Sequence, residues 1–293
     1  MKLTELGHRP LVVAAVTPLR EDGTRLDLDA IGPYAAFLTR NGADGVFACG
    51  TTGEGVLLSL DERRATAVAF RDVLEGVLVV HAGAQTTADT VALAAHASEI
   101  GADAVAVIAP PYYPLDEDAL TAHFVAAASA CAPLPFYCYA FAARSGYPIP
   151  VDVVRRIAAE APNLAGLKVS ESPFERVLPY LQLGLPVLIG NEPLLGDGLA
   201  HGAIGTVSGM AAAFPDVVRR SLDAGDEAAI AVLRRLRADL EASGQFIAAA
   251  KHVLDRRGVP VGPGMRAPLR RLTAAEAAAL DAAVADLTSV PTA

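Results

Sequence analysis

Lys168 is the residue whose type and setting point most directly to chemistry. It lies in the stretch LAGLKVS (residues 164–170), where an apolar run predicts a buried strand that meets a loop. Only three lysines occur in the 293 residues, and arginine supplies most of the positive charge. Burial would lower the pKa of a lysine from about 10.4, and the neutral amine can attack a carbonyl to form a Schiff base. Alternatively, Lys168 keeps its ammonium group in water or in an ion pair at the strand end.

The loop GTTGEG (residues 50–55) also follows an apolar run and could bind an anion. Its glycines let backbone N–H groups come close to a ligand, and Thr51 and Thr52 add hydroxyl donors. Because the GK[ST] ending of a phosphate-binding loop is missing, a carboxylate is the expected ligand. The same letters could also form only a tight connection between a strand and a helix.

Further polar side chains follow other apolar runs. Tyr139 could exchange protons with a substrate through its hydroxyl, or it could simply pack. Arg144 could bind a carboxylate through two hydrogen bonds, or it could remain solvated. Tyr112 and Tyr113 stand between prolines, so one of them could enter a pocket, and a contact with another subunit is equally consistent. Glu192 could bind substrate hydroxyls or place its charge at a helix N-terminus.

Eight short apolar runs predict the strands that would position these side chains. The runs cover residues 11–16, 45–49, 77–82, 104–109, 134–140, 164–169, 186–190 and 203–208. Continuously apolar strands indicate a parallel sheet that is covered on both faces. Eight β-α units that close on themselves form a (β/α)8 TIM barrel, whose active site lies at the carboxyl ends of the strands. An open doubly wound sheet is the alternative, but no GxGxxG turn follows the first run.

Helical patterns follow each run, and more helices follow the last one. They cover residues 26–40, 59–75, 87–100, 116–130, 151–160, 173–183, 193–200 and 214–222, with appended helices in 226–257 and 273–287. Ser59 and Glu62 form the pattern of a capping box. We therefore predict a catalytic barrel over residues 1–222 and a C-terminal helical extension over residues 223–293 that packs on it.

Composition excludes several classes of protein. A net charge of −9 and a pI near 5.1 argue against nucleic acid or an anionic membrane as a partner. Cys49, Cys131 and Cys138 have no CxxC spacing and are expected to be core residues in a reducing compartment. The long uncharged stretch 124–143 is divided by prolines, which favours a helix end plus a strand over a membrane span. We expect a cytoplasmic protein, and its six histidines show no metal-ligand spacing.

Six motifs, in order, carry a resemblance to a known family. They are VTPL (16–19), GTTGE (50–54), PPYY (110–113), YAFAARSG (139–146), GLK (166–168) and GAIGTVS (202–208). Together they resemble the dihydrodipicolinate synthase / N-acetylneuraminate lyase superfamily of class I aldolases. The resemblance implies a TIM barrel, a lysine Schiff base with pyruvate, small-molecule substrates, and a homodimer or homotetramer.

The resemblance also implies a role for each matching residue at the pyruvate. Lys168 would form the Schiff base with pyruvate or another 2-oxo acid. Thr51 and Thr52 would hold the pyruvate carboxylate, with Gly50 among the substrate-binding residues. Tyr139 would transfer protons during imine formation and during the making or breaking of the C–C bond. The protonated imine would act as an electron sink beside the developing carbanion, so this mechanism implies that no metal and no organic cofactor is needed.

Three other matching positions would act around this centre. Tyr113, reaching across from a neighbouring subunit, would relay protons with Thr52. Arg144 corresponds to the arginine with which the synthases bind a carboxylate at the entrance of the site. Ile204 would contribute an apolar wall.

The second substrate is left open by departures from either branch. Ala140 and Ala142 stand where the synthases usually carry asparagine and proline. Thr206 and Glu192 resemble the lyase branch, which binds substrate hydroxyls at these positions, whereas Arg144 resembles the synthases. The leading hypothesis is a pyruvate-dependent lyase or synthase that uses an aldehyde such as aspartate semialdehyde. The alternatives are a 2-keto-3-deoxy sugar acid or N-acetylneuraminate-type aldolase or dehydratase, and a non-catalytic barrel that binds small acids.

Overall fold

The computed structural model describes residues 3–288, and its eight strands form a closed parallel barrel in the order β1 to β8. The strands are β1 (Leu11–Ala14), β2 (Gly45–Ala48), β3 (Val77–His81), β4 (Ala104–Ile108), β5 (Phe136–Ala140), β6 (Leu164–Val169), β7 (Val187–Ile189) and β8 (Gly205–Ser208). Each apolar run of the sequence contains one strand. Nearly every strand residue is buried, as expected for strands covered on both faces. The predicted TIM barrel is confirmed.

Helices alternate with these strands, and further helices follow the last strand. They are α1 (Ile31–Arg40), α2 (Leu60–Val73), α3 (Thr87–Glu99), α4 (Glu117–Cys131), α5 (Ala142–Ser145), α6 (Val151–Glu160), α7 (Leu178–Leu181), α8 (Leu195–Ala200), α9 (Pro215–Ala224), α10 (Glu227–Glu241), α11 (Phe246–Arg256), α12 (Ala274–Ala283) and α13 (Ala285–Thr288). The capping box of Ser59 and Glu62 is present at the start of α2 and confirms that prediction.

The helix predicted for residues 173–183 is only partly formed. A short 3-10 turn covers Phe174–Arg176, and α7 has four residues. Pro179 lacks an N–H and fits only in the first turn of a helix, so α7 has to begin anew just before it. Gly184 then adopts a positive φ of 73°, which ends the segment.

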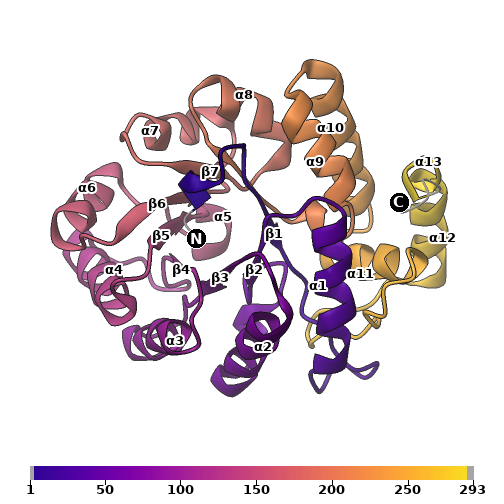
Figure 1. The fold of residues 1–293 in the computed structure, drawn as a ribbon, viewed down its shortest axis with the longest axis horizontal. Helices are drawn as coiled ribbons and strands as arrows, with labels where there is room; N and C mark the ends of the chain where they lie inside the picture. The colour runs from indigo at the N-terminus through magenta and orange to yellow at the C-terminus, as the bar shows by residue number, and fades with distance from the viewer. Residues whose placement is uncertain (1–2, 289–293) are drawn as a thin grey trace. The chain divides into compact units, whose positions relative to one another are not determined.

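The chain divides into two compact units, each of which is described separately. The first contains the residues up to Pro10 together with Val77–Val207, and the second contains Leu11–Gly76 together with the residues from Ser208 onward. Within the first unit, α3, α4 and α6 lie side by side on the outside of its strands (Figure 1). Within the second unit, α9 packs against α10, and α10 against α11. The predicted division at residue 222 stays a prediction.

The uncharged stretch 124–143 divides as predicted. Helix α4 ends at Cys131, and β5 begins at Phe136. Between residues 3 and 288, the structure contains no helix that is both long enough and apolar enough to cross a membrane.

Candidate active site

Lys168 and Tyr139 lie side by side in the first unit. Strands β5 and β6 pair in parallel with Tyr139 opposite Lys168. The Lys168 side chain places its Nζ 3.8 Å from the centroid of the Tyr139 ring, and only 4% and 2% of the two residues is exposed. The face of a phenol ring is electron-rich and favours a positive charge above it. The ring can therefore stabilise a cationic nitrogen, such as a protonated imine, and it carries a hydroxyl group that can donate or accept a hydrogen bond.

Gly190 leaves room for the lysine side chain. It follows β7, and its N–H donates to the Val169 carbonyl at 2.7 Å, which holds this backbone beside β6. A Cβ atom at position 190 would lie 2.0 Å from Ser170 Oγ and 3.2 Å from Lys168 Cε. Only glycine fits here without displacing the hydroxyl of Ser170 and the chain of the lysine.

Aromatic rings surround Tyr139 on the first unit. His81, the last residue of β3, meets its ring edge-on at a centroid distance of 5.9 Å. Phe141 lies at 5.9 Å with its plane tilted by 32°, and the Arg144 guanidinium carbon lies 5.6 Å from the Phe141 centroid. The sequence analysis did not identify Phe141. Its position two residues after Tyr139 was the available signal, because alternate residues of a strand point to the same side.

Tyr113 lies in the loop between β4 and α4, next to Tyr112. The two rings pack edge to face with centroids 4.8 Å apart, and 79% of Tyr112 and 72% of Tyr113 is exposed. An exposed aromatic pair of this kind is available for a contact outside the chain. That Tyr113 serves a neighbouring subunit stays a prediction.

The lyase-like positions of the first unit are deeply buried. Glu192 and Thr206 have no exposed surface, and Thr206 Oγ1 donates to the Ile189 carbonyl at 2.6 Å. The hydroxyl proton of Thr206 is therefore used within the barrel. Ile204 precedes β8 and donates its N–H to the Val187 carbonyl at 2.9 Å. The predicted roles of these residues in substrate binding stay predictions.

The second unit carries the loop with Gly50, Thr51 and Thr52. Thr17 Oγ1 donates to the Gly53 carbonyl at 2.6 Å, and Gly55 N–H donates to the Gly50 carbonyl at 3.1 Å. These bonds close the loop into a tight turn of buried and half-buried residues. A carboxylate-binding role is consistent with such a fixed turn and stays a prediction.

A buried ion pair that the sequence analysis missed holds this loop. Lys251 of α11 donates from Nζ to Glu54 Oε1 and to the Gly264 carbonyl, both at 2.6 Å, and Glu54 Oε2 accepts the Arg266 N–H at 2.8 Å. Both side chains of the pair have no exposed surface. Burial lowers the pKa of Lys251, and the carboxylate of Glu54 opposes that shift. Glu54 has a left-handed φ of 56°, so the ion pair fixes a conformation that a free loop would rarely adopt.

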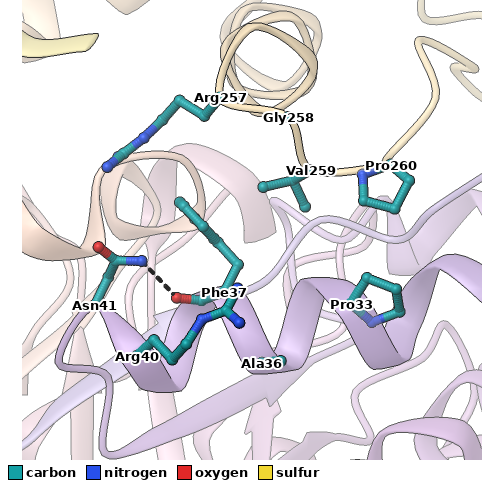
Figure 2. A pocket seen from close by; sticks show the side chains of 9 residues that line it. All are labelled: Pro33, Ala36, Phe37, Arg40, Asn41, Arg257, Gly258, Val259 and Pro260. Carbon is teal, nitrogen blue, oxygen red and sulfur yellow. Dashed lines mark hydrogen bonds between the residues drawn. The ribbon is translucent and has the colours of Figure 1, made fainter. Parts of the chain in front are cut away.

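A cavity of about 460 Å³ lies elsewhere in the second unit, between α1 and the segment 257–260 (Figure 2). None of the predicted site residues lines it. Two of its polar side chains serve the fold: Asn41 Nδ2 donates to the Phe37 carbonyl at 2.8 Å, and Arg257 pairs with Asp216 at 2.9 Å. Within residues 3–288, no group of three His, Cys, Asp or Glu side chains could hold a metal ion.

Comparison with known proteins decides the family. The sequence model of the dihydrodipicolinate synthetase family matches residues 8–287. The chain belongs to this family. It is 36% identical to an uncharacterized DapA-like lyase of Halobacterium salinarum over 96% of this chain and 95% of that protein. It is 34% identical to a 4-hydroxy-tetrahydrodipicolinate synthase of Corynebacterium aurimucosum, over 94% and 92%.

A solved structure agrees with this assignment. Proteus mirabilis N-acetylneuraminate lyase superposes with a TM-score of 0.84 at 28% identity, covering 96% of this chain and 99% of that chain. The family resemblance found in the sequence motifs is confirmed. The protein is a lyase of the dihydrodipicolinate synthase / N-acetylneuraminate lyase superfamily.

Proposed function

We propose that this lyase joins pyruvate to an aldehyde, or releases pyruvate from the product, through a Schiff base on Lys168. The observation that carries the proposal is the buried Nζ 3.8 Å from the centroid of the Tyr139 ring. Burial shields the amine from water, and the electron-rich ring favours the iminium that results when the amine attacks a carbonyl. A lysine kept only for packing or solubility needs neither feature.

The reaction follows from these two side chains. The Lys168 amine adds to the keto carbon of pyruvate, and loss of water leaves an imine. Loss of a proton from the methyl carbon gives an enamine, because the protonated imine nitrogen accepts the electron pair of the broken C–H bond. The enamine carbon then attacks the aldehyde, and water releases the hydroxy-2-oxo acid and the free lysine. The Tyr139 hydroxyl would carry protons in these steps.

Other parts of the proposal rest on the family alone. They are carboxylate binding by Gly50, Thr51 and Thr52, proton relay by Tyr113, carboxylate binding by Arg144, and substrate contacts of Ile204, Glu192 and Thr206. The cytoplasmic location, the homo-oligomeric state and the absence of a cofactor likewise stay predictions. Aspartate semialdehyde is the acceptor that the synthase-like relatives suggest.

Borohydride trapping tests the proposal. Incubation with pyruvate and borohydride should add a reduced pyruvyl group that peptide mass spectrometry maps to Lys168. Lys251 is the matched control, because it is also buried but is held by a carboxylate. An adduct on Lys251, or no adduct with any 2-oxo acid, would contradict the mechanism and favour a non-catalytic acid-binding barrel.

A further inference from the structure

A row of stacked groups leads outward from the lysine. The Lys168 amine lies over the Tyr139 ring, Phe141 lies against the same ring, and the Arg144 guanidinium lies over Phe141. Tyr139 is buried, Phe141 is half-buried and Arg144 is exposed. The row therefore runs from the reacting amine to the solvent, and it ends in a cation.

The turn that carries Phe141 and Arg144 is fixed by hydrogen bonds. The buried carboxylate of Glu171 accepts the Ala142 N–H at 2.7 Å, at the start of α5. Ser145 Oγ, at its end, donates to the Tyr147 carbonyl at 2.6 Å, and Gly146 closes the turn with a positive φ of 92°. The backbone that carries Phe141 and Arg144 is therefore fixed before any ligand arrives, which reduces the entropy lost on binding.

The turn that carries Phe141 and Arg144 offers few hydrogen-bond partners to a substrate with several hydroxyl groups. The residues beside Phe141 in the chain, Ala140, Ala142 and Ala143, have side chains that cannot form hydrogen bonds. Thr206 and Glu192 are fully buried, and the Thr206 proton is already donated to a carbonyl of β7. A hydroxyl group pressed against Phe141 would lose its hydrogen bonds to water without replacing them, which is unfavourable.

Arg144 supplies an exposed cation to this turn. Arg144 makes no ion pair with any residue between 3 and 288. Its guanidinium carbon lies 5.6 Å from the centroid of the Phe141 ring. A guanidinium in this position can pair with a carboxylate while the body of the same ligand contacts the ring.

We propose that the acceptor is an aldehyde with a flat, aromatic or similarly apolar body and an acidic group beyond it, for which Phe141 is the specificity-determining residue. The body packs on Phe141, and the acidic group pairs with Arg144. This inference rests on the proposed function and names an acceptor class for the same site, which differs from the aspartate semialdehyde that the synthase-like relatives suggest. A polyhydroxylated aldehyde makes neither contact.

The reaction with this acceptor is the same carbon–carbon bond formation. The methyl carbon of pyruvate, as the enamine on Lys168, bonds to the aldehyde carbon, and the aldehyde oxygen takes up a proton. Water then hydrolyses the imine. One pyruvate and one aldehyde give one 4-aryl-4-hydroxy-2-oxo acid, with no oxidant, reductant or further reactant.

Four aldehydes test the inference against pyruvate: 4-carboxybenzaldehyde, benzaldehyde, aspartate semialdehyde and glyceraldehyde. The kcat/KM for 4-carboxybenzaldehyde should exceed that for benzaldehyde and that for glyceraldehyde by roughly tenfold or more. Benzaldehyde lacks the carboxylate that would pair with Arg144, and glyceraldehyde also lacks the ring that would pack on Phe141. Preference for aspartate semialdehyde or glyceraldehyde would overturn the inference.

Two variants locate the preference. In Phe141→Leu the kcat/KM ratio of 4-carboxybenzaldehyde to glyceraldehyde should fall roughly fivefold. The conservative variant Phe141→Tyr keeps an aromatic ring and should keep the wild-type ratio. In Arg144→Met the ratio of 4-carboxybenzaldehyde to benzaldehyde should approach one. Ratios measured within one preparation do not depend on how much of it is folded.

Phe174→Leu is the matched control. Phe174 is also half-buried in the first unit, where its ring contacts His201 at a centroid distance of 5.1 Å. Its substitution should leave both ratios unchanged. Equal effects of Phe174→Leu and Phe141→Leu, or unchanged ratios in both, would overturn the inference. Borohydride trapping with pyruvate separates the two proposals: without an adduct both fail, and with an adduct but no such preference only this inference fails.

Discussion

Between residues 3 and 288, each of the two units buries one lysine, and the two lysines have different surroundings. Lys251 is 1% exposed and its ammonium group meets the carboxylate of Glu54 and the carbonyl of Gly264. Lys168 is 4% exposed, and its amine lies over the ring of Tyr139. The carboxylate of Glu54 opposes the effect of burial on the pKa of Lys251, whereas the face of the Tyr139 ring can stabilise a cationic nitrogen such as a protonated imine. Burial alone therefore does not distinguish the two lysines, whereas the ion pair of Lys251 and the ring contact of Lys168 do.

Removal of the first lysine should have the largest effect on chemistry. Lys168→Met keeps an apolar side chain of similar length, so we expect a folded barrel that forms no imine. Turnover should fall by roughly a thousandfold or more, because the nucleophile is lost. Circular dichroism would check the fold, and pyruvate-dependent turnover the activity. Wild-type turnover in this variant would remove Lys168 from the mechanism.

Removal of the second lysine should affect stability instead. Lys251→Met leaves the Glu54 carboxylate buried without its cation, which should reduce the free energy of unfolding by about 3–5 kcal/mol. The pyruvyl adduct on Lys168 should still form in the folded fraction. Urea unfolding measures the first effect, and borohydride trapping the second.

A double variant sharpens this prediction. Glu54→Gln combined with Lys251→Met removes both charges, so we expect it to be more stable than Lys251→Met alone. If the double variant were as unstable as the sum of the two single ones, the pair would not be coupled and the ion-pair account would be wrong.

The sequence predicted one of these lysines and missed the other. Lys168 was recognisable because a lysine in an apolar run, at the end of a predicted strand, is unusual in a chain with so few lysines. Lys251 stands in a helical pattern, and its partner is 197 positions away, so no local pattern could pair them. The barrel was also predictable, because each of its eight strands appears in the sequence as a short apolar run followed by a helical pattern.

Side-chain contacts beyond the strand ends were less predictable. Phe141 was missed, since its contact with Tyr139 depends on the backbone conformation just after the end of β5. The burial of Glu192 and Thr206 was not foreseen either, because residues at a strand end can face either the solvent or the barrel interior. Residue types and their spacing in the sequence were enough to predict Lys168 as the reacting amine. The side chains that surround it depend on three-dimensional packing, which no local sequence pattern predicts.

Tyr139 tests whether the ring or its hydroxyl distinguishes the two lysines. Tyr139→Phe keeps the aromatic face over which Lys168 lies and removes only the proton-transferring group. Turnover should fall roughly a hundredfold or more, whereas the adduct trapped at long incubation should still map to Lys168. Stopped-flow measurement of imine formation would show the slowed step. Unchanged turnover would assign the proton transfer to another group.

The smallest expected effect concerns the space around the reactive lysine. Gly190→Ala places a methyl group where Ser170 Oγ and Lys168 Cε now lie, at 2.0 and 3.2 Å, so both must move. Such overpacking costs about 1–3 kcal/mol, and we expect slower imine formation along with it. Combining it with Ser170→Gly removes the closer contact and should restore part of the rate. Gly146→Ala is the control in the same unit, because no atom lies within 4 Å of a Cβ there. It should cost stability through its positive φ of 92° while leaving the rate of imine formation unchanged.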